Sequence, residues 1–559
     1  MIVAEYIARF LQKHGVTHVF GYDGSMMLKI ADEISRTDGI DFYQGFHEQA
    51  SSFEADAYAR VTHSIGVALV TSGPGAVNAL AGCADAYMDS VPFLIISGQD
   101  RLTHIRTNPG VRLSGFQDLD VVDMARPIAK YAVQLTDAAN IAYELEKCIF
   151  MAMDGRKGPT LLDVPMDIQF MEVRENIPHY GEHKHSKTIS LIDIRKILEL
   201  IYAAKSPVIL AGGGIDTADA TNQLAEFVSI TGIPVVTTLN GHDVYKDSVG
   251  SSGLYGAPEA NLAIYYSDLV IAIGTRFGQQ QVGKNPDQYT HAKIVHIDID
   301  SKELGRVLKP EIGIEADLKM FLEIISLQIE PGKMQNLDKW KSNISKWIEL
   351  YHKELYVNNK GIEPVKLVNF IGEICPENTI FTNDVGQNTM WVCQGLHMRR
   401  NQRLLTSSGY ASMGFSLPAA IGAKMAYPDS LVISFSGDGG FHMNIQELQF
   451  VNIHKLDIKF VVFNNNTLGM MREVQRIYYN NNYVGSNTDD FICIDLKKVS
   501  ALYNMDYVML DCDSDFDIIT EVISSSRATI IDCRLPIDTY LRNWNEFTEM
   551  HPEALQRIG

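Results

Sequence analysis

Short apolar runs alternate along the chain with longer segments whose apolar residues recur at helical spacing. The runs are rich in valine, isoleucine and leucine, as in residues 66–70, 207–211 and 459–463, and they have the length of buried strands. Residues 191–203, LIDIRKILELIYA, are typical of the helical segments. Strands that alternate with helices predict βαβ units. We therefore expect an α/β protein built from doubly wound parallel sheets with helices on both faces.

Two polar stretches interrupt this alternation and have the composition of linkers. They cover residues 175–187 and about 330–343. The chain has 559 residues, which is more than one hydrophobic core supports. We therefore expect three α/β domains, at 1–170, 188–330 and 355–559.

The first and third of these blocks contain similar stretches. Residues 66–98 and 430–465 both predict a strand, a Ser-Gly-x-Gly turn, a helix and a second strand. Pro74 stands in one turn where Asp438 stands in the other. The likeness indicates either a pattern that βαβ units commonly share or two domains of common ancestry.

Charge and cysteine content narrow the classes of function. The 68 Asp and Glu residues outnumber the 48 Lys and Arg residues, which gives a formal net charge of -20. This charge repels nucleic acids and anionic membranes, so we expect neither as a partner and favour small-molecule chemistry. The seven cysteines are scattered without a CxxC pair, no apolar run approaches ~20 residues, and the first residues lack the layout of a signal peptide. We expect a soluble cytoplasmic protein without a disulfide framework or a zinc site.

The sequence GDGG at 437–440 places an acidic residue where a phosphate-binding loop is expected. A strand end followed by glycines and a helix start suits a diphosphate, yet the carboxylate of Asp438 would repel that anion. The conflict disappears when Asp438 holds a divalent cation such as Mg²⁺, which takes carboxylate, amide and phosphate oxygens together. The next predicted strand leads into Asn465, at the same edge of a parallel sheet. Each motif alone is typical of a tight turn or a polar loop, but together they predict a metal-diphosphate site.

This pair of motifs resembles the signature of the thiamine-diphosphate (ThDP) enzymes, which is GDG followed one strand later by NN. Over nearly the whole chain the sequence is similar to the acetolactate synthases among them. The stretches that carry the likeness follow one another in the family's order: GVTHVFGYDGSMM, FHEQASSFEADAYAR, TSGPGAVNALAGCADAYMDSVP, GFQDLDVVDMARPIAKY, GTRFG, KIVHIDID, NDVGQNTMW, ASMGFSLPAAIGA, GDGGFHMNIQEL and NNNTLGM. The resemblance implies a pyrimidine-binding domain, a central FAD-type domain and a diphosphate-binding domain, which match the three blocks.

The resemblance also implies how the cofactors ThDP and Mg²⁺ are held. The Mg²⁺ ligands would be the side chains of Asp438 and Asn465 and the backbone carbonyl of Thr467. Other positions match family contacts to the diphosphate or lie near the thiazolium, and these are Gly24, Ser25, Gln387, Gly439 and Gly440.

Three positions match the family's catalytic residues, namely Glu48, Met413 and Gln117. Glu48 would hydrogen-bond the pyrimidine ring of ThDP, and Met413 would support the bent cofactor. The carbonyl of Ala411 would accept a hydrogen bond from the amino group of that ring. In the family the residues equivalent to Glu48 and Met413 meet across a subunit interface. The resemblance therefore implies a homodimer as the smallest active unit, or a homotetramer made of two dimers.

Three further positions match residues that line the family's substrate pocket. They are Phe116, Gln117 and Lys130. The match implies a small 2-oxo acid as the donor, with pyruvate as the first choice. The enzyme would then be a transferase that moves a two-carbon unit from pyruvate to a second carbonyl compound.

The central block resembles the family's FAD-binding domain. Gly213, Arg276 and Asp298 are the candidate contacts to FAD. Glycines after a strand and a later aspartate at a strand end are on their own only a weak dinucleotide fingerprint. Some relatives keep the domain without the flavin, so both states stay open.

Departures from the family's pattern bear on the substrate. The family's Tyr-Pro-Gly-Gly near the thiazolium is Tyr-Asp-Gly-Ser at 22–25. Gln279 and Gln280 replace an acidic and a basic residue, and Val474 replaces a tryptophan. The resemblance implies that the missing basic residue and tryptophan recognise the carboxylate and the alkyl group of a second 2-oxo acid. Losing a charge-assisted contact to a carboxylate costs about 1.5 to 3 kcal/mol of binding. We therefore expect an aldehyde or a nucleotide-linked keto-sugar as the acceptor in place of a simple 2-oxo acid.

A basic loop adds a second indication about the acceptor. The stretch 98–117 looks longer than the family's loop and contains Arg101, His104, Arg106 and Arg112. These charges are either simply solvated, or they steer a phosphorylated or nucleotide-linked acceptor.

Several activities fit the same residues. The alternatives to the carboligase are a true acetolactate synthase that uses a second pyruvate, a simple 2-oxo acid decarboxylase, and an FAD-dependent pyruvate oxidase. A non-catalytic subunit is disfavoured because the residues expected to bind and activate ThDP are all present. A regulatory subunit and the pathway are not indicated by the sequence.

Overall fold

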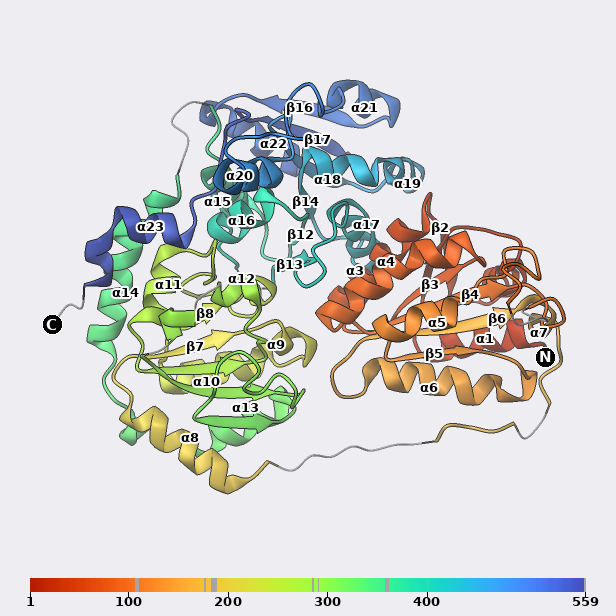
Figure 1. The fold of residues 1–559 in the computed structure, drawn as a ribbon, viewed down its shortest axis with the longest axis horizontal. Coiled ribbons are helices and arrows are strands. Elements are labelled where there is room, and N and C mark those ends of the chain that lie inside the picture. The colour runs from red at the N-terminus through yellow and green to blue at the C-terminus, as the bar shows by residue number, and fades with distance from the viewer. Residues whose placement is uncertain are drawn as a thin grey trace.

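The chain folds into three parallel α/β units, which Figure 1 shows in order from red to blue. They are seen in a computed structural model that describes residues 1–105, 110–174, 177–181, 189–283, 286–289, 291–356, 361–399 and 401–556. The expected linker at 175–187 lies mostly outside the described residues. The strands within each sheet pair in parallel, so the α/β fold class predicted from the alternation of strands and helices is confirmed.

The first sheet has six strands in the order β2-β1-β3-β4-β6-β5. Successive side chains of a strand point to opposite faces, so Leu94 and Ile96 of β4 enter one core and Phe93 and Ile95 enter another. The strands are β1 (His18–Gly21), β2 (Asp41–Gln44), β3 (Gly66–Val70), β4 (Phe93–Gln99), β5 (Tyr131–Gln134) and β6 (Pro159–Pro165). The helices are α1 (Val3–Lys13), α2 (Leu28–Ser35), α3 (Glu48–Thr62), α4 (Pro74–Asp89), α5 (Val121–Ala125), α6 (Ile141–Met153) and α7 (Met166–Gln169).

The central sheet has five strands in the order β11-β10-β9-β7-β8. Its strands are β7 (Pro207–Ala211), β8 (Val235–Thr237), β9 (Leu269–Ile273), β10 (Lys293–Asp298) and β11 (Ile312–Glu315). Its helices are α8 (Leu191–Ala203), α9 (Gly214–Thr217), α10 (Thr221–Thr231), α11 (Pro258–Tyr265), α12 (Gln279–Val282), α13 (Leu318–Gln328) and α14 (Asp338–Tyr351).

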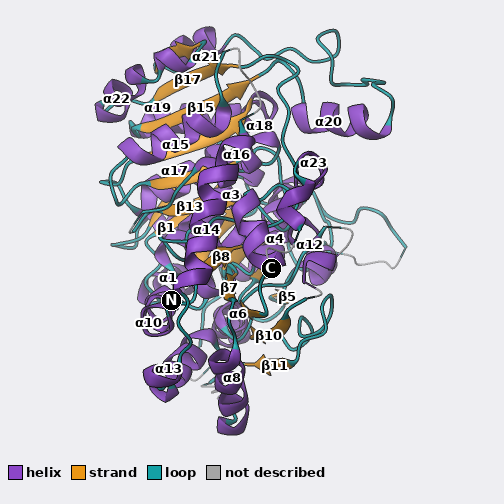
Figure 2. Ribbon diagram, turned by 90° about the vertical axis from the view of Figure 1, so that its left-hand side faces the viewer, coloured by secondary structure: helices purple, strands orange, loops and turns teal. Residues whose placement is uncertain are grey.

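The third sheet has six strands in the order β13-β12-β14-β15-β17-β16, and Figure 2 shows helices covering it. When the strands are numbered along the chain within each unit, the third sheet has the same strand order as the first. The similar stretches 66–98 and 430–465 therefore occupy equivalent places, since they contain β3 with β4 and β14 with β15. The strands are β12 (Ile380–Asn383), β13 (Arg403–Thr406), β14 (Val432–Gly437), β15 (Ile458–Asn464), β16 (Asp506–Leu510) and β17 (Thr529–Arg534). The helices are α15 (Pro364–Ile374), α16 (Gln387–Gly395), α17 (Ser416–Ala426), α18 (Asp438–Met443), α19 (Leu448–His454), α20 (Gly469–Tyr478), α21 (Leu496–Leu502), α22 (Asp517–Ser524) and α23 (Trp544–Met550).

The first and third units meet along α3 and α17, which lie side by side in Figure 1. Phe53 of α3 contacts Phe415 edge-on, with ring centroids 5.5 Å apart. The helices approach so closely that a Cβ on Gly422 would collide with the carbonyl oxygen of Glu54. The central unit packs beside this pair, which places three units around one junction.

Helix α14 begins at Asp338, inside the stretch whose polar composition predicted a linker. Its apolar residues face one side, and Trp340 and Trp347 are buried in a core of the central unit. The Trp340 indole donates a hydrogen bond to the carbonyl of Pro207 at 2.9 Å. Phe547 of α23 lies in the same core, so the end of the chain returns to the central unit. Within the described ranges, no helix is both long and apolar enough to cross a membrane.

Candidate functional site

The carboxyl ends of β14 and β15 bring together the two motifs that predicted a metal site. The strands are neighbours in the third sheet and pair in parallel, with Gly437 opposite Phe463. Asp438 follows directly after β14, and Asn465 follows directly after β15. Both residues are buried at this edge.

Asp438 has only 4% of its surface exposed, and its two carboxylate oxygens differ. Oδ1 accepts a hydrogen bond from the Gly439 amide at 2.8 Å, whereas Oδ2 has no hydrogen-bond partner among the described residues. Burial raises the pKa of this carboxyl to about 7, against the opposing effect of the nearby backbone amides. An unpartnered buried carboxylate oxygen is costly, and a bound cation would remove that cost. The residues present therefore fit Mg²⁺.

Asn465 and Thr467 form a short turn beside Asp438. The Thr467 amide donates to Asn465 Oδ1 at 3.3 Å, and Asn465 Nδ2 donates to Gln387 Oε1 at 3.5 Å. The Thr467 hydroxyl donates to the carbonyl of Ser486 at 2.6 Å. Because this side chain is already engaged, a metal contact from Thr467 would come from its backbone carbonyl.

Two glycines follow Asp438 where neighbouring side chains leave no room for a Cβ. A Cβ on Gly439 would stand 2.6 Å from Leu468 Cδ2 and 3.3 Å from Met413 Cε. A Cβ on Gly440 would collide with the carboxylate of Asp384. Neither position has room for a larger residue, and the Gly439 amide is already engaged by Asp438 Oδ1, so the diphosphate contacts expected at both glycines stay a prediction.

Asp384 is a site residue that the sequence reasoning missed. It is buried after β12, and its two oxygens accept from the amides of Gly414 and Ser416, each at 3.0 Å. Burial raises its pKa to about 6, while these backbone hydrogen bonds lower it. The carboxylate therefore restrains the chain just after Met413. The signal that could have found it is an acidic residue directly after the short run IFTN at 380–383, which the strand prediction does not include.

The segment before Met413 is a loop of unusual backbone conformation, which we call the methionine loop (residues 407–413). Ala411 has a φ of 57°, a value that residues with a Cβ rarely adopt. The Ser412 amide donates to Ser407 Oγ at 2.9 Å and closes the loop. The loop ends with the Met413 methyl group directed toward Gly439.

Glu48 is the first residue of α3 and has 8% of its surface exposed. Its Oε2 accepts from Asn78 Nδ2 at 3.0 Å. Its Oε1 lies 3.1 Å from the position that a Cβ on Gly75 would take. Glu48 therefore sits against α4 of its own unit, whereas Met413 faces Gly439 in the third unit.

The first unit also holds the two residues expected near the thiazolium. A Cβ on Gly24 would stand 2.5 Å from Thr71 Cβ, so this position is closely packed. The Thr71 methyl group is in turn 2.8 Å from the place of a Gly75 Cβ, beside Glu48. Ser25 is exposed to solvent.

The three expected substrate residues are placed differently. Gln117 has a φ of 56°, and its Oε1 accepts from Ser72 Oγ at 3.3 Å. Phe116 is 64% exposed. Lys130 donates to the carbonyl of Asp154, and burial lowers its pKa to about 8. Asp154 lines a cavity of the central unit, so Lys130 supports the wall of that cavity.

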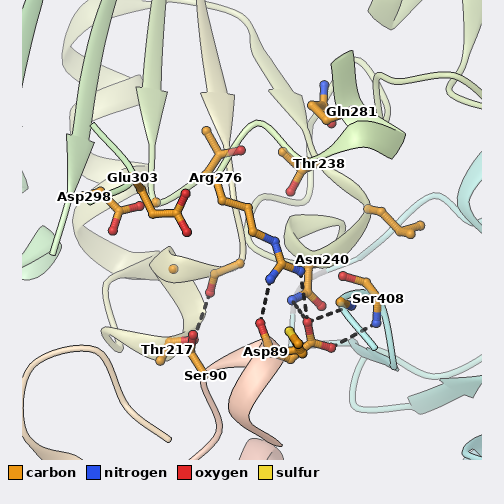
Figure 3. A pocket seen from close by; sticks show the side chains of 18 of the residues that line it. Asp89, Ser90, Thr217, Thr238, Asn240, Arg276, Gln281, Asp298, Glu303 and Ser408 are labelled. Atoms are coloured by element: carbon orange, nitrogen blue, oxygen red, sulfur yellow. Dashed lines mark hydrogen bonds and ion pairs between the residues drawn. The ribbon is translucent and has the colours of Figure 1, made fainter. Parts of the chain in front are cut away.

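A cavity of about 970 Å³ lies in the central unit, bordered by the first and third units (Figure 3). Its size is at the upper end of small-molecule sites. It contains the three candidate FAD contacts, Gly213, Arg276 and Asp298. Asp298 ends β10, and burial raises its pKa to about 6. Glycine-lined strand ends and a carboxylate in one large cavity fit a dinucleotide such as FAD.

The departures that bear on the acceptor lie in two places. Gln280 is exposed on α12 and lines the cavity of the central unit, and its carbonyl accepts from the Leu254 amide at 2.8 Å. Val474 is half-buried on α20. Beside it, Glu473 is buried and pairs with Arg476 at 2.7 Å.

The basic loop of the first unit is only partly described. Arg106 lies outside the described residues. Arg101 and Arg112 are exposed, and His104 Nδ1 lies 3.4 Å from Asp100 Oδ2.

Family models match all three units. Residues 1–124 match the N-terminal TPP-binding domain of the thiamine pyrophosphate enzymes, residues 194–325 match their central domain, and residues 384–533 match their C-terminal TPP-binding domain. Thiamine pyrophosphate is another name for ThDP. Together these matches include the methionine loop, the Asp438 motif and most residues that line the cavity, but not residues 153–157.

The chain is also similar to acetolactate synthases. It is 35% identical to the acetolactate synthase large subunit of Lactococcus lactis subsp. lactis (strain IL1403), over 93% of this chain and 90% of that one. It is 34% identical to the large subunit of Cyanidium caldarium, over 94% of this chain and 91% of that one. It is 34% identical to chloroplastic acetolactate synthase 2 of Nicotiana tabacum, over 87% and 74%. The chain therefore belongs to the thiamine pyrophosphate enzymes, and it is an enzyme of the acetolactate synthase type.

Proposed function

We propose that the chain is a ThDP- and Mg²⁺-dependent carboligase that transfers a two-carbon unit from pyruvate to a carbonyl acceptor. The observation that carries this proposal is the buried Oδ2 of Asp438, which has no hydrogen-bond partner in the described part of the chain and lies at the ends of the paired strands β14 and β15. A cation at this place would satisfy that oxygen and attract a diphosphate to the turn that contains Gly439 and Gly440.

The residues of the site then have separate tasks. Asp438, Asn465 and the Thr467 carbonyl hold Mg²⁺, and Gln387 lies within reach of the same place. When bound, ThDP supplies the nucleophilic carbon at which a 2-oxo acid loses carbon dioxide. Met413 supports the cofactor from the methionine loop.

Glu48 has the remaining task, which is to share a proton with the pyrimidine ring. In its own chain it lies at the start of α3, against Asn78 and Gly75 of α4, whereas Met413 lies against Gly439 in the third unit. This supports a homodimer or homotetramer in which the first unit of one subunit faces the third unit of its partner. The buried, unpaired thiols support the reducing cytoplasm as the compartment.

FAD is the proposed occupant of the cavity in the central unit. The cavity volume, the glycines after β7 and the carboxylate of Asp298 support it. Gln117 and Phe116 are the proposed contacts to pyruvate. Gln117 lies against Gly73 and Ser72 in the turn after β3, and Phe116 precedes it in the chain.

The proposed acceptor is an aldehyde or a nucleotide-linked keto-sugar. Gln280 offers no positive charge to the carboxylate of a second 2-oxo acid, and Val474 fills less space than a tryptophan. The second candidate is a true acetolactate synthase that uses pyruvate twice. The 35% identity to a relative of that name favours it as strongly.

One incubation separates these functions. The protein is mixed with ThDP, Mg²⁺, FAD and pyruvate, with and without 2-oxo acids, aldehydes and nucleotide-linked keto-sugars, and products are identified by mass spectrometry. We expect carbon dioxide release that requires ThDP, and a mixed product with an aldehyde or keto-sugar. Fast acetolactate formation that no other carbonyl compound reduces would establish the second candidate. Carbon dioxide release without ThDP would overturn both.

A further inference from the structure

The end of α4 reaches the junction of all three units, and Asp89 stands there. Its carboxylate accepts hydrogen bonds from the backbone amides of Ser408 and Gly409 in the third unit, both at 2.9 Å. It also accepts from Arg276 Nη2 and Asn240 Nδ2 in the central unit, both at 3.3 Å. Figure 3 shows Arg276, Asn240 and Ser408 converging on Asp89. One buried side chain of the first unit therefore joins the other two units.

The methionine loop begins at these same amides. Ser407 donates a hydrogen bond to Asp85, which lies one turn before Asp89 on α4. Ala411, with its φ of 57°, keeps its strained conformation only because the surrounding contacts restrain it. The two aspartates of α4 thus hold the first half of the loop whose far end presents Met413.

The partners of Asp89 also face the cavity of the central unit. Arg276, Asn240, Ser408 and Gly409 all line it. The contact is tight, because a Cβ on Gly409 would stand 2.6 Å from both Arg276 Nη2 and Asp89 Oδ1. A ligand that orders Arg276 and Asn240 would therefore order the carboxylate that holds the methionine loop.

We propose that Asp89 is a positioning residue that couples the occupant of the central cavity to the methionine loop. A filled cavity restrains the loop through Asp89 and so favours ThDP binding. This inference rests on the proposed function, because it requires FAD and ThDP to be the two ligands. Coupling of this kind is reciprocal, so ThDP must favour FAD binding by the same factor.

The test measures binding and not turnover. Calorimetry gives the dissociation constant of ThDP with Mg²⁺ for flavin-free and FAD-loaded protein, and FAD fluorescence gives the reciprocal constant with and without ThDP. For the natural chain we expect FAD to tighten ThDP binding at least about fivefold. In Asp89→Asn, which keeps the shape but loses the charge, we expect the factor to fall to about one. Ser407→Ala is the matched control, because it loosens the same loop on the side away from the cavity. It should weaken ThDP binding and keep the factor.

A second variant guards against misfolding around the buried Arg60, which lies 3.5 Å from Asp89. Gly409→Ala leaves every charge in place and forces the Arg276 and Asp89 side-chain ends apart from the loop, so it too should remove the coupling. The proposal is overturned when both variants keep the factor of the natural chain, or when the natural chain has no coupling. If the natural chain binds no ThDP, whether flavin-free or loaded with FAD, the proposed function is overturned as well. If it binds ThDP but both variants keep the factor by which FAD tightens ThDP binding, only the role of Asp89 is overturned.

Discussion

Glu54 on α3 and Glu447 before α19 place two carboxyl groups together in the interface between the first and third units. Both are fully buried. Glu447 accepts from the Phe46 amide at 3.2 Å, whereas neither oxygen of Glu54 has a hydrogen-bond partner in the described part of the chain. Burial raises the pKa of Glu447 to about 8, and burial together with the charge of Glu447 raises the pKa of Glu54 well above its usual value. The interface therefore keeps protons that the unfolded chain would release.

Glu54→Gln should make the protein more stable at alkaline pH. The raised pKa means that the folded chain holds a proton above pH 4.5, the ordinary pKa of the group, so this residue lowers stability as the pH rises. Glutamine does not titrate, and one pKa unit corresponds to about 1.4 kcal/mol. We expect a gain of at least about 1 kcal/mol at pH 8 and little change at pH 4.5.

Thermal and urea unfolding between pH 4.5 and pH 8 measures this effect. Glu226→Gln, at an exposed position of α10, serves as the control and should follow the natural chain. If the stability of Glu54→Gln changes with pH in the same way as that of the natural chain, the raised pKa of Glu54 is contradicted.

Asp438→Asn should raise the Mg²⁺ concentration that half-saturates ThDP binding. The variant keeps the shape of the side chain but removes the charge that would offset the cation, which costs about 1.5 to 3 kcal/mol or roughly tenfold or more in affinity. Calorimetric titration of Mg²⁺ in the presence of ThDP measures the shift. Asp429→Asn, exposed near the opposite end of β14, is the matched control and should leave the titration unchanged. If Asp438→Asn and Asp429→Asn are half-saturated at the same Mg²⁺ concentration, Asp438 does not bind the metal.

Gly422→Ala should destabilise the contact between α3 and α17. The added methyl group would collide with the backbone carbonyl of Glu54, which cannot rotate away, so the helices must separate. Overpacking of this kind typically costs about 1 to 3 kcal/mol. We expect a lower melting temperature by calorimetry, whereas Gly332→Ala, with open space around its Cβ, should melt with the natural chain. An unchanged melting temperature in Gly422→Ala would show that α3 and α17 can separate without a loss of stability.

The double variant Gln280→Arg with Val474→Trp should shift the product toward acetolactate. It restores a positive charge and a large apolar side chain at the two departures, which favours a 2-oxo acid as acceptor. Competition between pyruvate and an aldehyde, followed by mass spectrometry, should show the product ratio rising about tenfold or more. Gln279→Arg adds the same charge one residue earlier on α12 and should have a much smaller effect. If both variants keep the ratio of the natural chain, these positions do not select the acceptor.

The parts of this structure that depend on local sequence were predictable. Apolar runs marked the central strands, and each strand run with its following turn located Asp438 and Asn465 at one sheet edge. Neighbouring strands of a βαβ unit usually pair in parallel, so that proximity needed no knowledge of distant residues. The strand order shared by the two outer sheets was visible as a short likeness between 66–98 and 430–465.

Features that depend on distant residues were not predictable in this way. Asp384 acts on amides some thirty positions later, and Asp89 joins units more than a hundred residues apart. Lys130 matches a substrate position, yet its ammonium group is held by the carbonyl of Asp154. The polar start of α14 concealed the buried face that carries Trp340. In each case the partner is selected by tertiary packing, on which periodicity and turn chemistry carry no information.

The common strand order of the two outer sheets has a consequence for stoichiometry. The turn after β3 is the topological equivalent of the turn after β14, but Pro74 occupies it in place of Asp438. Proline brings neither a carboxylate nor a backbone N–H, so of the two equivalent turns only the one after β14 carries the carboxylate that is proposed to hold the metal. A titration of the assembled protein should accordingly saturate at a single equivalent of Mg²⁺ and ThDP per chain.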